Sequence, residues 1–255
     1  MCRIVTIANQ KGGVAKSTTA QAMTTGLTMR GYRALLIDAD SQRNTSISFG
    51  IPKAEANLYA VMSGEIAIKE AIRHTAQGDI VPGDRMLAFA QERFVKPGRE
   101  YIFRKAFASI LDEYDYIVID TPPSFGVITV NALAACRDVI VPMHADLYSL
   151  TGLMELNEVV SDVKEYYNPS VRIAGLLFTR YSDRSKLSRE LKESFEKMAQ
   201  KLGTKVFHAI IREGVVVREA QAERTSIFDK SPKSGPALDY AAFIDEYIQE
   251  GNSDG

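Results

Sequence analysis

The sequence predicts an α/β fold in which a doubly wound, mainly parallel sheet carries helices on both faces. Short runs rich in Val, Ile and Leu alternate with segments of helical periodicity along the 255 residues of the chain. Strands buried on both faces are apolar along almost their whole length, as these runs are. Because right-handed crossovers join parallel strands, the segments between them should cover both faces of the sheet as helices.

Six short runs, each bounded by turn residues, are expected to form the strands. They are Ile4–Ala8, Leu35–Asp38, Asp79–Pro82, Tyr116–Asp120, Val139–Pro142 and Val171–Phe178. Four further elements are expected near the end of the chain. They are a helix over Ser185–Lys201, a short strand near Lys205–Ala209, a helix near Val216–Glu223 and a closing helix over Ala237–Gln249.

Composition and charge limit the classes of function. Lys and Arg number 31 against 32 Asp and Glu, so the net charge of -1 gives no overall attraction to DNA or to a membrane. Cys2 and Cys136, far apart, favour a reducing compartment over a disulfide framework, and no apolar run approaches the ~20 residues of a membrane helix. We expect a cytoplasmic protein with one domain over residues 1–250 and a disordered tail over 251–255.

A glycine-containing loop follows the first expected strand. It reads Lys11-Gly12-Gly13-Val14-Ala15-Lys16-Ser17-Thr18 and leads directly into a helix. Backbone N–H groups of such a loop, backed by a helix N-terminus, bind polyphosphate, while a lysine neutralises it and a hydroxyl binds Mg²⁺. Lys16 and Ser17 fit the last two roles. Ala15 stands where the usual pattern has glycine, and its Cβ would cost roughly 1 kcal/mol if the position requires positive φ.

Carboxylates follow two other expected strands. Asp38 and Asp40 come at the end of Leu35–Asp38, and Asp120 ends Tyr116–Asp120. Ligands of open α/β sheets bind beyond the carboxyl ends of the strands, where these acids should meet the glycine-containing loop. A pair of carboxylates there can orient an attacking water, and one can hold Mg²⁺ through water.

The loop resembles the deviant Walker A motif of the ParA/MinD superfamily of P-loop ATPases, with Lys11 as the signature lysine. The resemblance runs almost the full length of the chain and indicates a ParA/Soj-type partition ATPase. It implies an ATP hydrolase in which Lys11 reaches the phosphates of a partner subunit, so that hydrolysis requires a homodimer with nucleotide sandwiched between the subunits. It also implies that Asp40 positions the hydrolytic water. Arg43 stands where the family commonly has glycine.

The expected cofactors are ATP and Mg²⁺, and the resemblance assigns the site residues. The catalytic residues would be Lys11, Lys16 and Asp40. Nucleotide would be bound by Lys11, Gly12, Gly13, Val14, Ala15, Lys16, Ser17 and Thr18, with Arg180 and Arg212 in the two segments that commonly contact adenine. Metal would be bound by Ser17 and Asp120, and by Asp40 through water.

Partition of a plasmid or chromosome is the expected function. The resemblance then implies that ATP-bound dimers bind DNA non-specifically and that a ParB-like centromere-binding protein stimulates hydrolysis. A MinD-like or other cargo-positioning ATPase is an alternative, but the acidic closing helix argues against a membrane partner. Cys2 and Cys136 give no plausible ligand set for an electron-transfer cluster, and a biosynthetic P-loop ligase remains as a further alternative.

A local basic surface would have to bind the DNA. Over Arg180–Lys233 the sequence has 13 Lys or Arg and 8 Asp or Glu, a local excess of five positive charges in a chain of net charge -1. The interleaved acids leave open that this is an ordinary solvated helix face. The DNA-binding candidates are Arg184, Lys186, Arg189, Arg218, Arg224, Lys230 and Lys233.

Overall fold

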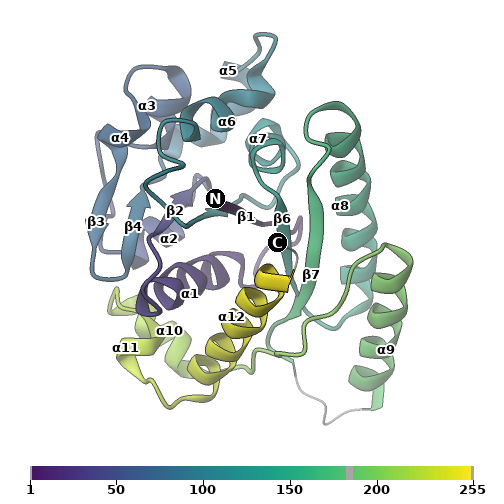
Figure 1. Cartoon of the computed structure of the whole chain (residues 1–255). Helices are drawn as coiled ribbons and strands as arrows, with labels where there is room; N and C mark the ends of the chain where they lie inside the picture. The colour runs from purple at the N-terminus through teal and green to yellow at the C-terminus, as the bar shows by residue number, and fades with distance from the viewer. Residues whose placement is uncertain (1, 182–185, 254–255) are drawn as a thin grey trace.

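The computed structural model describes residues 2–181 and 186–253. Seven strands form one sheet in the order β3-β4-β2-β5-β1-β6-β7, with only β3 antiparallel to its neighbour (Figure 1). The strands are β1 Arg3–Ile7, β2 Ala34–Asp38, β3 Arg73–Thr75, β4 Gly78–Val81, β5 Tyr116–Asp120, β6 Asp138–Met143 and β7 Arg172–Phe178. The predicted fold class is therefore confirmed, as is every strand predicted for the sheet from its apolar run, apart from shifts at the ends.

Helices connect the strands. They are α1 Lys16–Met29, α2 Asn44–Ser48, α3 Leu58–Ser63, α4 Ile68–Ala71, α5 Ala90–Arg93, α6 Ile102–Phe107, α7 Val127–Ala135, α8 Leu147–Tyr166, α9 Lys186–Lys201, α10 Val215–Ala222, α11 Ile227–Lys230 and α12 Gly235–Ser253, with 3-10 helices η1 Arg85–Phe89 and η2 Arg99–Tyr101. None of the helices in the described residues has the length and apolar character needed to cross a bilayer.

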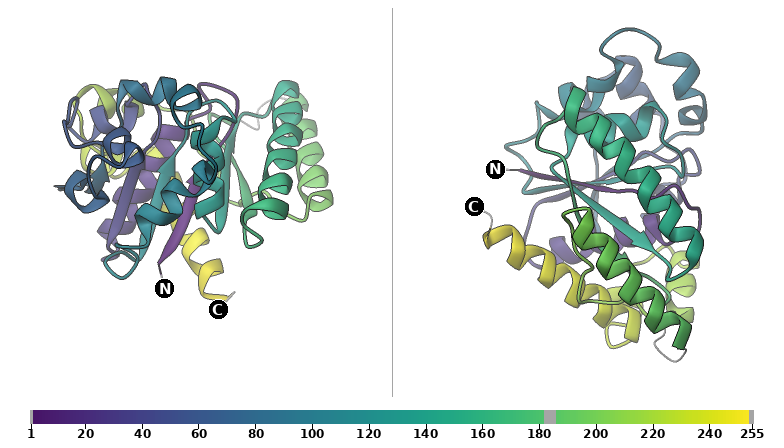
Figure 2. Two further views of the ribbon diagram at one scale, coloured as in Figure 1. Left: turned by 90° about the horizontal axis from the view of Figure 1, so that it is seen from above. Right: turned by 90° about the vertical axis from the view of Figure 1, so that its right-hand side faces the viewer.

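The helices form two layers around the sheet (Figure 2). Alternate strand residues such as Val5 and Leu36 pack with α1, α10, α11 and α12 on one face. On the other face, neighbours such as Leu35 and Ile117 pack with α3, α4, α6 and α7, and β6 and β7 pack with α8 and α9. This alternation buries both sides of the parallel strands, which explains why these strands lack polar residues along most of their length.

Three elements differ from the sequence-based expectation. The hairpin strand β3 was not predicted, because three residues are too few to show a period. The expected strand near Lys205–Ala209 forms only an isolated bridge between Val206 and Leu176. The next two residues do not pair with β7, because the N–H groups of His208 and Ala209 donate to the carboxylate of Glu246 at 2.9 and 3.0 Å. The chain meets the sheet again at the bridge between Ile211 and Thr179. The closing helix reaches Ser253, beyond the expected end at Gln249.

The carboxyl ends of the central strands bring the three chemically unusual junctions together. β1 lies between β5 and β6. The strands β2 to β5 lie on one side of β1, and β6 and β7 lie on the other. Ile7 at the end of β1 pairs with Asp120, which in turn pairs with Asp38 at the end of β2. The glycine-containing loop and the carboxylates therefore share one edge of the sheet, at the point where ligands bind in such folds.

Candidate functional site

The loop between β1 and α1 has the backbone of a phosphate-binding loop. Gly13 and Ala15 have φ of +77° and +68°, and α1 begins at Lys16 with no side chain capping its first turn. The backbone N–H groups at this helix end are therefore available to an anion. Positive φ at Ala15 agrees with the sequence argument that the position favours glycine.

Lys16 lies almost buried in the curve of this loop. The residue is only 7% exposed, and its Nζ donates to the carbonyl of Lys11 at 3.0 Å. Burial lowers the pKa of Lys16, while Asp120 and Asp40 raise it in part. A buried ammonium group between the loop and two carboxylates is placed to neutralise polyphosphate and is not free in solvent.

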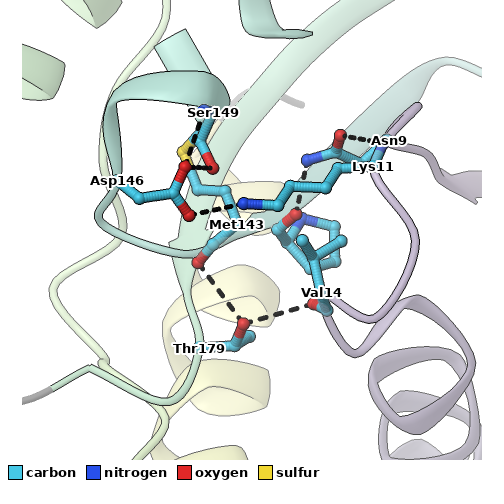
Figure 3. A network of polar contacts seen from close by, with 8 residues as sticks. Asn9, Lys11, Val14, Met143, Asp146, Ser149 and Thr179 are labelled. Carbon is cyan, nitrogen blue, oxygen red and sulfur yellow. Dashed lines mark hydrogen bonds and ion pairs between the residues drawn. The ribbon is translucent and has the colours of Figure 1, made fainter.

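Lys11 is held in a different direction. Its Nζ lies 2.5 Å from Oδ2 of Asp146, at the start of α8, and its backbone N–H donates to Asn9 Oδ1 at 2.9 Å (Figure 3). Asp146 also caps α8, because its Oδ1 accepts from Ser149 N at 3.0 Å. Although partial burial opposes ionisation, the Lys11 and Ser149 contacts lower the pKa of Asp146. The signature lysine is thus fixed against a neighbouring helix.

The far side of the loop is tied to β6 and β7. The single O–H of Thr179 is shared between the carbonyls of Val14 and Met143, at 3.2 and 3.3 Å (Figure 3). The side chain of Val14 is fully buried. Val14 therefore supports the loop from beneath through its packing and its carbonyl.

Asp38 and Asp40 have different environments. Asp38 is fully buried, and its Oδ2 accepts from Ser46 N at 2.8 Å and Ser46 Oγ at 2.5 Å. Burial raises the pKa of Asp38 despite these hydrogen bonds. Asp40 lines the cleft and accepts from Gln42 N at 2.9 Å, which leaves one carboxylate oxygen for a ligand or water. Asp38 therefore fixes the strand-end turn, and Asp40 faces the cleft.

Asp120 lacks a hydrogen-bond donor of its own. Both of its carboxylate oxygens are buried, and neither accepts a hydrogen bond from the residues that the structure describes. Burial, and then the charge of Asp38, raise the pKa of Asp120 well above its ordinary value, while Ser17 and Lys16 lower it in part. Buried carboxylates are normally paired, so this group together with the Ser17 hydroxyl forms an oxygen donor set that fits Mg²⁺.

A cleft of about 550 Å³ opens above these residues. Most of the predicted phosphate-binding and metal-binding residues line it, whereas Lys11, Val14 and Asp120 do not. The lining residues predicted from sequence are Gly12, Gly13, Ala15, Lys16, Ser17, Thr18, Asp40, Arg180 and Arg212. The structure therefore brings together residues that lie up to 200 positions apart in the sequence.

Two of the predicted arginines are in the lining of the cleft. Arg180 lines it with φ of +51°. Arg212 lines it too, but its guanidinium forms a bidentate pair with Asp239, at 2.8 and 2.7 Å. That pair directs the side chain of Arg212 toward α12, and the backbone N–H of Arg212 also donates to Asp239 Oδ2, at 2.9 Å.

The DNA-binding candidates lie in two groups. Arg189 is exposed on α9, whereas Arg224 and Lys233 are exposed around α10 to α12 on the other side of the molecule (Figure 1). Lys230 is paired with Glu223. Arg218, also exposed, lines the nucleotide cleft, which sequence reasoning did not anticipate. Lys186 begins α9, and Arg184 lies outside the described residues.

Sequence reasoning missed several residues of the site. Asp146 holds Lys11 although 135 positions separate them, so no local pattern could pair the two. Its only sequence signal is that an Asp three residues before Ser149 is typical of a helix N-cap. The cleft is also lined by Asn44, Ile47, Ser48, Val217, Gln221 and Tyr240 from α2, α10 and α12.

Comparisons with known proteins agree with this geometry. A family model described as an AAA domain matches residues 2–173. The chromosome partitioning protein ParA of Caulobacter vibrioides is 37% identical, over 86% of this chain and 83% of its own length. The sporulation initiation inhibitor protein Soj of Bacillus subtilis is 32% identical, over 98% of this chain and 100% of its own.

A solved structure is similar over the whole fold. The cobyrinic acid a,c-diamide synthase of Mycobacterium smegmatis with bound ATP analog and magnesium has a TM-score of 0.86 at 30% identity, and the match covers 100% of this chain and 98% of that one. The relatives, the deviant loop and the order of the sheet point to the same assignment. The chain belongs to the ParA/Soj type of P-loop ATPases.

Proposed function

We propose that this chain is a cytoplasmic, Mg²⁺-dependent ATP hydrolase that acts in plasmid or chromosome partition. In this proposal ATP drives formation of a homodimer, the dimer binds DNA without sequence preference, and a ParB-like centromere-binding protein stimulates hydrolysis. The similarity to partition proteins named ParA and Soj supports it, as does a cleft that combines a phosphate-binding loop with buried carboxylates.

The residues of the cleft divide the chemistry among them. The loop N–H groups and Lys16 bind the phosphates, and Ser17 and Asp120 would hold Mg²⁺, which neutralises phosphate charge when bound. The remaining carboxylate oxygen of Asp40 accepts a hydrogen bond from the attacking water and orients it. The positions of these side chains at the edge of the sheet support these roles.

The position of Lys11 is the main observation that supports the proposed dimer. Lys11 is not among the residues that line the cleft, its side chain is 35% exposed, and Asp146 holds its ammonium group at the surface. A lysine in this position serves its own nucleotide poorly, but it can reach the phosphates of a second copy that faces the cleft. Charge supplied from a partner subunit makes hydrolysis depend on assembly.

Light scattering of Asp40→Ala with and without Mg²⁺-ATP tests this proposal. Asp40 is assigned to the water, so the variant should bind ATP, shift from monomer to dimer and hydrolyse ATP far more slowly. Lys16→Ala, which lacks the buried ammonium group on the phosphates, should remain monomeric at the same ATP concentration. If the dimer fraction of Asp40→Ala is the same with and without ATP, the proposal of an ATP-driven dimer is refuted.

The structure favours partition over a MinD-like role at the membrane. A membrane-binding terminal helix needs a free apolar face. The apolar side of α12, including Tyr240, Phe243, Ile244 and Tyr247, is instead buried against α1 and the sheet. Its exposed side includes Asp245, which pairs with Arg30, and offers no cluster of basic residues to anionic lipid.

A biosynthetic reaction is the second candidate, because the similar solved structure is that of a diamide synthase with an ATP analog. An ATP-dependent synthase couples hydrolysis to formation of an amide in an acceptor, whereas a partition ATPase releases only ADP and phosphate. Hydrolysis that is stimulated by DNA and by a cognate partner protein supports partition. Hydrolysis that depends on a carboxylic acid acceptor and an amide donor would support the synthase.

A further inference from the structure

A second groove of about 610 Å³ lies between α7, α8 and η2. It is separate from the nucleotide cleft, with which it shares no lining residue. Its apolar lining consists of Phe125, Val127, Val130, Val159 and Val163, and two tyrosines, Tyr166 and Tyr167, lie beside them. Tyr166 is 65% exposed. A groove with an apolar lining and an exposed aromatic ring is suited to the side chains of a bound peptide.

The charges of the groove favour a basic occupant. Arg99, the one basic residue in its lining, donates to Glu100 and to the carbonyl of Phe94 at 3.3 and 3.1 Å. Asp162 makes no ion pair within the described part of the chain. It belongs to a row of exposed acids on α8, spaced three and four residues apart and accompanied by a single lysine, Lys164. The row consists of Glu155, Glu158, Asp162 and Glu165.

Gln91 connects this groove to the catalytic edge of the sheet. It lines the groove and also a neighbouring hollow of about 340 Å³, whose lining includes Asp40 and Pro123. Its Oε1 accepts from the N–H of Val127 at 2.9 Å. Gly126, the N-cap of α7, has no side chain to do this, so Gln91 caps the helix from α5.

The loop over residues 121–126 therefore has the groove on one side and the Asp40 hollow on the other. Gly126 and Val127 line both spaces, and Asp120 begins the same loop. A peptide that packs against Phe125 and Val127 presses on the segment that positions the carboxylate edge. Binding in the groove can thus change hydrolysis without any contact with nucleotide.

We propose that the groove is the docking site of a basic, amphipathic peptide segment of the protein that stimulates hydrolysis. The apolar side chains of that segment enter the groove, its Lys or Arg side chains pair with Asp162 and the acidic row of α8, and Gln91 is a positioning residue that transmits binding to the loop. This inference rests on the proposed function, because it names the surface through which its partner acts.

Fluorescence anisotropy with labelled synthetic peptides tests the site. One set alternates Lys or Arg with Leu or Phe, and a matched set carries Glu in place of the basic residues. The basic set should bind the wild-type chain, and Asp162→Lys should weaken binding about tenfold, as expected for reversal of a charge at an interface. Tyr166→Ala should also weaken it. Glu65→Lys, the same charge change on an exposed residue between α3 and α4, should leave binding unchanged.

Gln91→Ala separates docking from transmission. The basic peptides should still bind, stimulation of hydrolysis should be lost even when the groove is saturated with peptide, and amide hydrogen exchange at the first turn of α7 should become faster. Gln91→Glu, which keeps an acceptor for the N–H of Val127, should restore the slow exchange. Unaltered exchange in Gln91→Ala would overturn the transmitting role.

The docking site is judged independently of partition. Absence of binding by every basic peptide, equal binding of the acidic set, or exchange protection that leaves residues 91–101, 121–130 and 155–167 unprotected would overturn it. ATP-dependent dimerisation is measured on the same variants by light scattering. If the wild-type chain binds the peptides but stays monomeric with ATP, the result counts against the proposed function, whereas the assignment of the groove as a peptide-binding site still holds.

Discussion

Asp38 and Asp120 lie opposite each other in register at the carboxyl ends of β2 and β5, and both are fully buried. Hydrogen bonds from Ser46 satisfy Asp38. Asp120 has no such donor among the described residues. Two buried carboxylates at adjacent positions repel each other, so ionisation of Asp120 carries an energetic cost.

The first prediction concerns pH and Asp120. Because burial and Asp38 raise the pKa of Asp120, its ionisation destabilises the fold increasingly as pH rises from the unfolded value near 3.8. Asp120→Asn should therefore raise the Tm of the nucleotide-free protein, by about 2–4 °C for each kcal/mol relieved. The difference from wild type should grow with pH and vanish in strong acid.

Thermal melts across a pH series, with and without Mg²⁺-ADP, measure this effect. Mg²⁺-ADP should stabilise the wild type more as pH rises, because the metal binds the carboxylate form, and should add little to Asp120→Asn. Asp112→Asn, at an exposed position, is the matched control and should melt like the wild type. A lower Tm for nucleotide-free Asp120→Asn would mean that the carboxylate supports the fold.

The second prediction concerns the pair of Lys11 and Asp146. Both side chains are about one-third exposed, so the pair contributes no more than about 1 kcal/mol. Asp146→Asn keeps an N-cap for α8 and frees Lys11. Sedimentation should show an ATP-bound dimer that is tighter by up to about fivefold, and Lys11→Ala should remove the dimer-dependent hydrolysis in both backgrounds. A weaker dimer would instead place Asp146 in contact with the partner subunit.

The third prediction concerns Ala15, whose φ of +68° is unfavourable for a residue with a Cβ. Ala15→Gly relieves roughly 1 kcal/mol of strain and loses part of it through the greater freedom of glycine in the unfolded chain. We expect a net gain of about 0.5 kcal/mol in denaturant melts and tighter ATP binding in calorimetry. Gly13→Ala, at φ of +77°, makes the opposite change and should weaken both.

The fourth prediction separates DNA binding from nucleotide binding. Arg189→Ala, on α9, should weaken DNA binding in gel shifts and reduce its salt dependence, while ATP-driven dimerisation is unchanged. Arg218→Ala should also alter ATP affinity, because Arg218 lines the cleft. Lys105→Ala, exposed on α6, is the control for charge alone. Equal DNA binding by Arg189→Ala and the wild type would exclude the α9 surface.

The sequence predicted the parts of the site that are contiguous. The geometry of the loop from Lys11 to Thr18 depends on residues within the loop, because Gly13 and the start of α1 fix the direction of the backbone. The apolar strands could also be predicted, because burial of both faces makes each of them a run of apolar residues. Ala15 was recognised as a departure, and its positive φ follows from the turn into α1.

The parts that depend on distant contacts could not be predicted. Asp146 meets Lys11 only because β6 lies beside β1. The strand expected near Lys205–Ala209 does not form, because the N–H groups of His208 and Ala209 donate to Glu246 on α12. The charge count over Arg180–Lys233 predicts one basic surface, but the structure separates α9 from α10 and α11. A sum of charges along a sequence does not say in which direction each side chain points.

The contact of Glu246 with the segment that follows α9 also determines how the chain can associate. Residues 204–211 cover the outer edge of β7, where Leu176 N donates to the Lys205 carbonyl and Ile211 N to the Phe178 carbonyl at 2.8 Å each. The opposite edge is the three-residue strand β3. Neither margin offers a long run of unpaired backbone groups to a second chain. Copies of the chain are thereby hindered from joining their sheets edge to edge into fibres.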